Sequence, residues 1–484
     1  MFNKRNLMAL IGLTLLSFLT MGYHPGLEDD HVYLAAIQKD LHPALYPFDA
    51  KFFQVQLQAT VFDKLMASFV RFTSIPVAYA VLLWQMATIF LILAAVARIV
   101  RFLFADERAV WGGVLLTGAM LTLPVAGTAL TLVDQHLHPR GIATACILLA
   151  ISALQTGNRW TACGLLAIAF LLHPIMAAFG LSFCLFLLLA NFTGMADKHP
   201  ALAAFAPLGW IFEPPNAAWN QAAATRRYYF LARWTWYEWL GAIGPLLLFW
   251  LLARWSSSSG YTRLQRFARV VLAYSGFQLA VALIIQAVPA CVRIIPLQPM
   301  RYLHLVYFFM VLIAGSLMGR YLLKSQPLRW ACCALIAFGG MFAGQRSLYA
   351  ASAHLELPWT KPVNPWVEAF VWIRHNTPQN AYFALDPDYM EAPGEDFHSF
   401  RALAERSVMA DALKDAAVVT QVPDLGASWV RQVQAQAGWQ SFEQQDFERL
   451  KAQFGVTWVL VESPRQTGLQ CVWHNRSLQV CRIP

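Results

Sequence analysis

The chain has 484 residues, of which 58% are hydrophobic and only 13% are charged. A soluble protein of this length needs more polar surface, so the composition excludes an ordinary soluble enzyme and indicates a membrane protein with several spans. The formal net charge of +9 does not indicate a nucleic-acid partner. The Lys and Arg residues stand in short groups beside apolar runs, where they set membrane orientation.

The first apolar run covers 7–21 and follows Lys4 and Arg5. We interpret it as a retained anchor, because no small-x-small cleavage site follows it. The later spans are each about long enough to cross the hydrocarbon core, and they are expected at 76–97, 109–131, 140–156, 160–192, 238–254, 266–288, 301–322 and 328–346.

The run 160–192 is too long for one plain span and is interrupted by "HPIM" at 173–176. It is either one kinked span or two shorter ones, balanced in the second case by a weak apolar run near 200–212. The fold class is therefore a polytopic α-helical membrane protein with nine to eleven transmembrane helices. Basic groups fall on alternate loops, which predicts a cytoplasmic N-terminus and places everything after 347 outside.

The first outer loop, 23–75, has helical character. Apolar residues recur at helical spacing through 50–72, with polar residues on the opposite face. This pattern predicts an amphipathic helix lying in the membrane interface, or alternatively a helix packed on the protein's own outer domain. A shorter helix is expected at about 31–41. We assign this loop, together with the spans, to a transmembrane domain of residues 1–357.

Residues 358–484 change in composition and predict an extracytoplasmic α/β domain, because helical and strand-like segments alternate. Asn364 is a plausible N-cap with Pro365 in the first turn. A strand is expected at 381–385, a helix at 441–455 with a glycine C-cap, a second strand at 456–462, and a hairpin between Cys471 and Cys481. These two cysteines form either a cross-strand disulfide, which needs an oxidising compartment, or a pair of free buried thiols.

Three adjacent acids, Glu28, Asp29 and Asp30, open the first outer loop, with His24 and His31 beside them. Adjacent acids repel, so partial burial would raise the pKa of one of them and make it a general base. The same carboxylates could instead hold a divalent cation. The structural alternative is an acidic collar that caps a helix or pairs with a basic residue.

The segment "TLVDQHLHPRG" at 131–141 concentrates Asp134, His136, His138 and Arg140 in one short turn. Two histidines and an acid could bind a metal, and Arg140 could bind a phosphate. A solvated turn that opens the next helix is the plainer alternative.

His173 lies beside Pro174 inside an apolar run. We favour a structural role for it, in which the side chain satisfies carbonyls freed by the kink, over a catalytic one. The segments 225–239 and 297–304 place Arg226, Arg227 and Arg301 beside Trp and Tyr. These arginines could clamp a lipid phosphate or belong to an aromatic belt, and the belt explains Arg301 less well because arginine is disfavoured on the outer side.

Nucleotide-binding and hydrolase motifs are absent from the sequence: it has no G-x-x-x-x-G-K-[ST], no G-x-G-x-x-G after a strand, no G-x-S-x-G and no H-E-x-x-H. An enzyme facing outward would in any case have no nucleotide pool, so its activated substrate would arrive on a lipid carrier.

This order of parts resembles the GT-C superfamily of integral-membrane glycosyltransferases. One helix is followed by "LEDD" at the start of a long outer loop, then by many spans and an outer α/β domain. The stretches "HPRGIATACILLAISAL", "LLHPIM" and "WIRHNTPQNAYFAL" also resemble uncharacterised bacterial membrane proteins of this type. The resemblance implies the bacterial inner membrane and a polyprenyl-phosphate-linked sugar donor, with inverting transfer to a glycan, lipid or protein acceptor.

Carried onto this chain, the resemblance makes Asp29 or Asp30 the base, supported by Glu28. Outer-face basic residues would hold the carrier phosphate, namely Arg301 and, in the same role, Arg140 or Arg226 and Arg227, with His136, His138 and His173 lining the substrate site. A divalent ion, Mg²⁺ or Mn²⁺, would be held by Asp30 and Asp134. The outer domain has no W-W-D motif, which argues against an oligosaccharyltransferase acting on Asn sequons.

Two other classes of function remain open at this point. A transporter or flippase for a lipid-linked or anionic solute would need charged groups along a path through the bilayer, and His173 is almost the only candidate within a span. A non-catalytic assembly or sensing protein would instead use the α/β domain to bind a partner.

Overall fold

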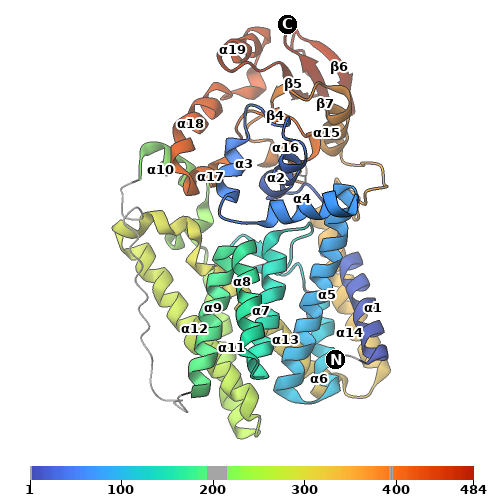
Figure 1. The fold of residues 1–484 in the computed structure, drawn as a ribbon, viewed down its shortest axis with the longest axis vertical. Coiled ribbons are helices and arrows are strands. Elements are labelled where there is room, and N and C mark those ends of the chain that lie inside the picture. Colours follow the sequence, from blue (N-terminus) through green and yellow to red (C-terminus); the bar gives the residue numbers. More distant parts are fainter. Residues whose placement is uncertain (1–2, 193–214, 392–393, 395) are drawn as a thin grey trace. The chain divides into compact units, whose positions relative to one another are not determined.

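The computed structural model describes residues 3–192, 215–391, 394 and 396–484, so the weak apolar run expected near 200–212 lies outside the described residues. The chain divides into two compact units, whose elements are labelled in Figure 1. Unit 1 comprises Met1–Met21, Trp84–Pro215 and Arg227–Gly344, and unit 2 comprises Gly22–Leu83, Asn216–Arg226 and Gln345–Pro484. The first outer loop, which we grouped with the spans from its sequence, thus belongs with the C-terminal segment.

Unit 1 is built from apolar helices. They are α1 (Lys4–Met21), α5 (Val77–Phe104), α6 (Glu107–Ala119), α7 (Pro139–Gln155), α8 (Arg159–Leu172), α9 (Pro174–Phe192), α11 (Trp236–Ser258), α12 (Thr262–Ala287), α13 (Leu303–Leu317) and α14 (Pro327–Leu348), with short turns η2 (Arg227–Tyr229), η3 (Leu231–Arg233), η4 (Pro289–Leu297), η5 (Pro299–Tyr302) and η6 (Met318–Leu323) and a small ladder of β1 (Pro124–Val125) and β2 (Leu130–Thr131).

Within the described residues, five helical stretches are long and apolar enough to cross a membrane: Val77–Phe104, Trp236–Ser258, Thr262–Ala287, Pro299–Leu323 and Pro327–Leu348. Three shorter apolar helices, Pro139–Gln155, Arg159–Leu172 and Pro174–Ala190, add to them. A membrane protein with several helical spans is thus supported, and the total of nine to eleven stays a prediction.

The long run 160–192 forms two helices, α8 and α9, and not one kinked span. His173 ends α8, and Pro174 occupies the first position of α9, where its missing N–H costs nothing. His173 Nδ1 accepts a hydrogen bond from the Met176 amide at 3.3 Å. The side chain therefore satisfies a backbone donor of α9, whereas we expected it to satisfy carbonyls.

Helices α6 and α13 approach closely because glycines face each other. A Cβ on Gly112 would lie 2.3 Å from the carbonyl oxygen of Gly315, and one on Gly319 would lie 2.2 Å from that of Arg108. Contact between small residues is how helices pack within a bilayer, where no hydrophobic force draws them together.

Unit 2 combines helices with a mixed sheet. Its elements are α2 (Asp30–Leu41), α3 (Lys51–Leu57), α4 (Phe62–Thr73), α10 (Ala217–Ala224), α15 (Pro365–Asn376), β3 (Tyr382–Ala384), η7 (Tyr389–Glu391), α16 (Phe400–Ala404), β4 (Ser407–Val408), α17 (Lys414–Gln421), η8 (Pro423–Leu425), α18 (Gly426–Ala435), η9 (Trp439–Ser441), α19 (Gln444–Phe454), β5 (Trp458–Glu462), β6 (Gln470–His474) and β7 (Leu478–Arg482).

The strand order among the described residues is β4-β3-β5-β7-β6. Strands β4, β3 and β5 run parallel, and β5, β7 and β6 run antiparallel. This arrangement confirms the expected strands and the C-terminal hairpin. Asn364 caps α15 through its side-chain oxygen, which accepts from the Trp366 amide at 2.8 Å, and Gly455 ends α19 with φ +79°, as both local signals predict.

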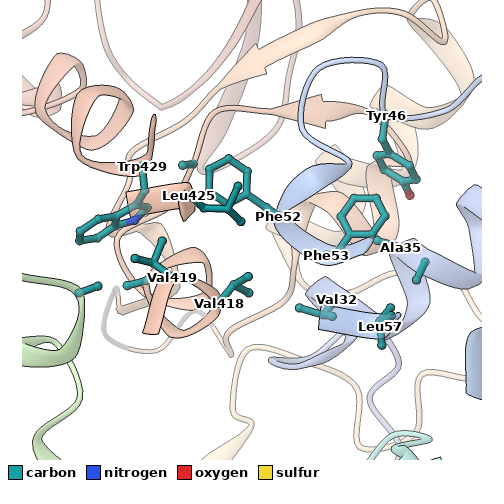
Figure 2. Packing of buried hydrophobic residues seen from close by; sticks show 14 of the residues in the cluster. Val32, Ala35, Tyr46, Phe52, Phe53, Leu57, Val418, Val419, Leu425 and Trp429 are labelled. Atoms are coloured by element: carbon teal, nitrogen blue, oxygen red, sulfur yellow. The ribbon is translucent and has the colours of Figure 1, made fainter. Parts of the chain in front are cut away.

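The first loop shares a core with the C-terminal segment (Figure 2). Phe52 and Phe53 of α3 are fully buried and belong to one cluster with Val418, Val419 and Trp429. Helix α3 is therefore packed on its own domain, which was the second of our two interpretations.

The single amphipathic helix expected over 50–72 is divided into α3 and α4. The break contains Thr60 and Val61, two adjacent β-branched residues of lower helix propensity. On α4, Phe72 is exposed while Met66 is buried, so an interfacial role for that helix stays a prediction.

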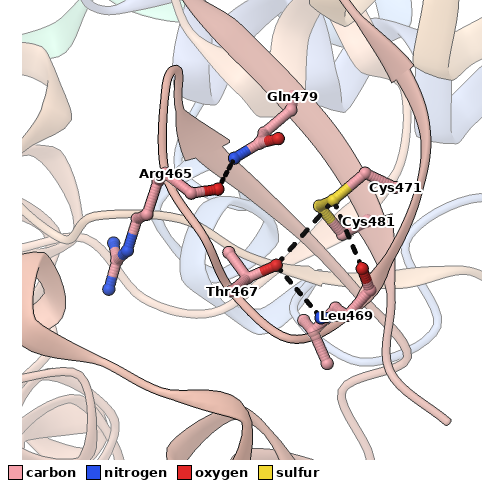
Figure 3. The surroundings of a disulfide bond; sticks show 6 residues. All are labelled: Arg465, Thr467, Leu469, Cys471, Gln479 and Cys481. Atoms are coloured by element: carbon pink, nitrogen blue, oxygen red, sulfur yellow. Dashed lines mark hydrogen bonds between the residues drawn. A yellow bond between two sulfur atoms is a disulfide. The ribbon is translucent and has the colours of Figure 1, made fainter.

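The C-terminal hairpin is closed by a disulfide between Cys471 and Cys481, which pair directly across β6 and β7 (Figure 3). A bulge between Cys471 and Trp473 interrupts the ladder beside it. The loop before β6 is tied to the hairpin by Gln479, whose amide nitrogen donates to the Arg465 carbonyl at 2.6 Å. The structure thus has a disulfide here, and not a pair of free thiols.

Candidate functional site

A buried ion pair occupies the segment between α6 and α7 of unit 1. Arg140 donates to Asp134 Oδ1 at 2.5 Å, and both side chains are largely buried. The local sequence sets this geometry, because His138 is the N-cap of α7 and its Nδ1 accepts from the Arg140 amide at 2.9 Å. The cap and Pro139 start the helix at Arg140, and Gln85 holds the segment by donating to the Asp134 carbonyl at 2.8 Å.

Histidines from three segments surround this pair. The ring of His138 lies 6.0 Å, centroid to centroid, from that of His136 and 6.0 Å from that of His173. His304 of α13 donates from Nε2 to the Leu132 carbonyl at 2.9 Å. All four imidazoles are buried.

Arg301 completes the group. It lies on η5, and its Nε donates to Gln298 Oε1 at 2.9 Å. Gln298 has φ +53° and turns the chain between η4 and η5. The Arg301 charge acts on both His173 and His304. We call these seven residues the Asp134 cluster: Asp134, His136, His138, Arg140, His173, Arg301 and His304.

Several buried polar atoms of the Asp134 cluster have no hydrogen-bond partner among the described residues. They are Asp134 Oδ2, both ring nitrogens of His136, and His304 Nδ1. Burial would raise the pKa of Asp134, but the charges of Arg140, His138 and His136 lower it to about 2. The cluster therefore presents a permanent carboxylate, two arginines and unused acceptor and donor atoms, as expected where a polar ligand, water or ion binds.

The three acids of the first loop have different environments, all within unit 2. Lys414 Nζ donates to Asp29 Oδ1 at 2.9 Å and to Glu28 Oε2 at 3.3 Å. Burial would lower the pKa of Lys414, but Asp29 and Glu28 raise it. Asp30 is buried at the start of α2, and its Oδ2 accepts from the Gly26 amide at 2.7 Å. Repulsion among these acids is thus offset by Lys414, and Asp30 is the most buried of the three.

The two arginines at 226 and 227 have partners of their own. Arg226 is buried in unit 2 and donates to the Leu413 carbonyl. Arg227 is exposed and pairs with Glu238 Oε2 at 3.0 Å, near the start of α11. Their predicted role in phosphate binding stays a prediction, as do the roles of the other candidate residues.

No protein-family model matches the chain, and no curated protein matches it. Solved structures do match it. The chain resembles archaeal oligosaccharyltransferases in structure.

The apo form of the oligosaccharyltransferase from Archaeoglobus fulgidus matches with a TM-score of 0.48 and 12% identity, over 95% of this chain and 70% of that one. The Archaeoglobus fulgidus enzyme AglB in complex with an inhibitory peptide and a dolichol-phosphate matches with 0.44 and 13%, over 94% and 69%. A complex of the Archaeoglobus fulgidus enzyme with Zn and sulfate matches with 0.43 and 14%, over 94% and 67%. At this level of identity the likeness concerns the fold alone and leaves the substrates of this chain open.

Some polar residues of the Asp134 cluster were not found by sequence reasoning. His304 follows Arg301 by three residues, which is one helical turn, and it lies in an apolar segment. An ionisable residue at such a position is a functional candidate by default, so a signal for it existed.

Sequence reasoning named only His31 of a second buried charge network. In unit 2, Arg401 is fully buried and donates to Asp49 at 2.7 Å and to Asp415 at 3.1 and 3.2 Å. His31 contacts Arg401, Asp411 and Asp415, and its Nδ1 lies 2.9 Å from Ser399 Oγ. The spacing of Asp411 and Asp415 was a further signal, because Asp411 precedes α17 and accepts from the Lys414 amide through Oδ1, while Asp415 lies in the first turn.

A small pocket adjoins this network. It lies at the carboxyl ends of the parallel strands β3 and β4, where open α/β sheets commonly bind ligands. Its polar lining includes His31, Asp386 and Asp411.

Metal-binding capacity, judged by groups of three ligating side chains, is found in unit 2. Among the described residues, two groups of three could hold an ion, His24 with Glu356 and His398, and His31 with Asp411 and Asp415. Neither group includes Asp30 or Asp134. These two residues belong to different units, and a metal held by them stays a prediction.

Proposed function

We propose that the chain is a membrane glycosyltransferase that uses a polyprenyl-phosphate-linked sugar and transfers it, with inversion, to an extracytoplasmic acceptor. One observation carries the proposal. Residues 134–140, 173 and 301, singled out from three distant parts of the sequence for their chemistry, meet in one buried cluster with two arginines and unpartnered polar atoms.

The cluster has the composition of an anion site. Arg140 pairs with Asp134, and the charges of Arg140 and Arg301 both act on His304, so two guanidinium groups are available to attract a phosphate. A small pocket lies in the same unit, lined by Gly127, Tyr228, Tyr229 and Gln298 among others. Because Gln298 both lines this pocket and accepts from Arg301, the pocket lies beside a guanidinium that suits phosphate geometry.

We assign charge stabilisation to this unit's arginines. The acceptor hydroxyl or amine loses its proton to a base and attacks the anomeric carbon. The bond from that carbon to the carrier-phosphate oxygen breaks, and the electron pair leaves with the phosphate. Arg301, with Arg140, would stabilise the charge that develops on the leaving phosphate. Attack opposite the leaving group inverts the anomeric centre.

We assign the base to the first loop, to Asp30 or Asp29, as the family resemblance implies. Asp30 is the stronger choice, because Asp29 is committed to Lys414. A carboxylate at the base position would take the acceptor proton directly.

A divalent ion fits part of the Asp134 cluster. Asp134 Oδ2 and a ring nitrogen of His136 are the atoms suited to hold it, since neither has another partner among the described residues. Such an ion would supply positive charge for the phosphate. Asp30 fits less well, because its Oδ2 accepts from a backbone amide.

The test compares lipids that copurify with the wild type and with Arg301→Gln. We expect mass spectrometry to find a polyprenyl-phosphate sugar on the wild type and at least tenfold less on Arg301→Gln. Arg329→Gln is the matched control, because Arg329 is exposed on α14, donates to the Leu322 carbonyl and has no predicted role in phosphate binding, and it should retain the lipid. Equal amounts on all three proteins would refute the role of Arg301.

The base is tested separately by Asp29→Asn and Asp30→Asn. A stalled enzyme accumulates its donor, so we expect Asp30→Asn to copurify with more of the sugar lipid than the wild type and to lose transfer. Full transfer activity in both variants would refute the assignment. Movement of a labelled lipid across liposomes without any chemical change would favour the transporter.

A further inference from the structure

A narrow three-stranded arrangement in unit 2 joins segments that are far apart in sequence. Tyr23 pairs in parallel with Leu355, and Leu27 pairs antiparallel with His398. Four backbone hydrogen bonds hold the segments: Tyr23 to His354 at 3.0 Å, Glu356 to Tyr23 at 2.8 Å, Glu28 to Phe397 at 3.2 Å and Ser399 to Gly26 at 2.8 Å. The first loop thus runs between 354–356 and 397–399.

Each of these three segments contributes one side chain to a compact group. Glu356 Oε2 lies 3.0 Å from His24 Nδ1 and 2.8 Å from His398 Nε2. Both imidazoles are buried, with 0% and 2% exposed, and the ring of Tyr349 covers His24 at 4.4 Å between centroids. The ligating atoms of the three side chains all lie within 4.8 Å of one another.

We propose that His24, Glu356 and His398 bind a Zn²⁺ ion that fastens the first loop to the C-terminal segment. Two histidines and one glutamate are an established zinc ligand set, with a fourth position taken by water. Tetrahedral ligands about 2.0–2.1 Å from zinc lie roughly 3.3 Å apart, so the two carboxylate–imidazole separations of 3.0 and 2.8 Å need to open by only about half an ångström or less. Mg²⁺ and Ca²⁺ fit poorly, because they prefer a shell of oxygens.

Hydrogen bonding alone leaves this group unsatisfied. His24 Nε2, His398 Nδ1 and Glu356 Oε1 are buried and have no hydrogen-bond partner in the part of the chain that the structure describes. In a metal site Glu356 Oε1 can serve as the second carboxylate oxygen on the ion, and water would have to accept from the outer ring nitrogens of His24 and His398, because a metal-bound imidazole donates its other N–H.

The second three-residue group, His31 with Asp411 and Asp415, is a poor cation site because it contacts an arginine. His31 and Asp415 both contact the Arg401 guanidinium, which already supplies the positive charge there. The His24 group has no such contact with a basic side chain among the described hydrogen bonds and ion pairs. The zinc proposal therefore concerns the His24 group alone, and it does not depend on the proposed transferase activity.

Binding should stabilise the folded unit, because the unfolded chain separates ligands that lie more than three hundred residues apart. The test uses the full chain in detergent, stripped with a chelator and then titrated with ZnCl₂. We expect one zinc per chain by elemental analysis, and a rise in the thermal midpoint of roughly 5–10 °C at a hundredfold excess over Kd.

Variants assign the site. His398→Ala and Glu356→Gln should each lose the zinc and the midpoint shift, while His474→Ala, an exposed histidine on β6, should keep both. His136→Ala should also keep them, which separates this ion from any metal of the Asp134 cluster. Titration of the wild type needs no variant, so it decides the matter even if a variant misfolds. No zinc uptake and no midpoint shift in the wild type, or equal uptake by all variants, would overturn the proposal.

Discussion

Replacing Arg401 by methionine should destabilise unit 2 more than any surface substitution. Methionine keeps an unbranched apolar stem but removes the guanidinium that pairs with Asp49 and Asp415. Arg401 and Asp415 are fully buried, and Asp49 is 1% exposed, so water cannot replace the lost partner. Burial would lower the pKa of Arg401, but the two carboxylates raise it, which shows how strongly they hold the charge.

The expected magnitude follows from this burial. Removing one member of a buried ion pair costs about 3–5 kcal/mol, because the other charge stays buried without a partner. For a domain of this size each kcal/mol lowers the midpoint by about 2–4 °C, so Arg401→Met should lower it by roughly 6–20 °C. Arg374→Met is the matched control. Arg374 is 33% exposed and pairs with Glu405 at 3.3 Å, and its loss should cost no more than about 1 kcal/mol.

The assay is thermal unfolding in detergent, followed by tryptophan fluorescence and limited proteolysis of unit 2. The six free cysteines all belong to unit 1, so thiol labelling follows that unit separately. Adding Asp415→Asn to Arg401→Met should recover part of the loss, because the second change removes an unpaired charge. A midpoint for Arg401→Met within error of the Arg374→Met value would refute the reasoning.

Three further predictions concern single features. Burial would raise the pKa of Asp415, but Arg401 and His31 lower it well below its usual value, so its stabilising effect is complete above about pH 4 and is lost as the pH falls further. Acid titration of stability should therefore be flatter for Asp415→Asn than for the wild type, and parallel curves would contradict this. Reducing Cys471–Cys481, or replacing both by Ser, should destabilise unit 2 by about 2–3 kcal/mol, as expected for a short closed loop, measured by urea unfolding with and without reductant. Gly315→Ala should lower the thermal midpoint of unit 1 by overpacking against α6, at a cost of about 1–3 kcal/mol, whereas Gly339→Ala, with open space around it, should not.

Local signals in the sequence predicted individual elements of unit 2 well. The Asn364 cap, the Gly455 stop and the Cys471–Cys481 hairpin each depend on residues within a few positions of one another. Such short-range interactions can be predicted from the sequence without a structure. For residues 160–192 the sequence indicated two alternatives, one kinked span or two shorter spans. The structure has two helices, which are separated by the cap residue His173 and by Pro174.

Contacts between residues far apart in the sequence could not be predicted in the same way. The spacing of Phe52 and Phe53 shows an apolar face, but only the fold shows that this face meets Val419 and Trp429. Membrane and protein core are equally apolar, so periodicity cannot distinguish them. For the same reason the break between α3 and α4 was missed, since tertiary contacts decide where a weak helix ends.

In the candidate site some residues were identified from the sequence, whereas their contacts with one another were not. Asp134, Arg140 and Arg301 were identified singly from their chemistry, and their meeting could not be deduced from spacing. The network of Asp49, Arg401 and Asp415 left almost no signal, because charged residues in a polar segment are ordinarily solvated. Only burial distinguishes a buried arginine from a surface one.

The division of unit 2 into separate stretches of chain has a consequence for synthesis. The first stretch, Gly22–Leu83, emerges early, whereas its partners in Gln345–Pro484 are made much later. At ~5–20 residues per second the ribosome takes roughly 15–50 s to cover the interval between them. During that time the aromatic face of α3 has none of its C-terminal partners, and Trp429 arrives only near the end. A premature stop before Val418 would therefore leave the buried face of α3 without Val418, Val419 and Trp429 and expose the first loop to proteases and chaperones, although every residue of that loop would be intact.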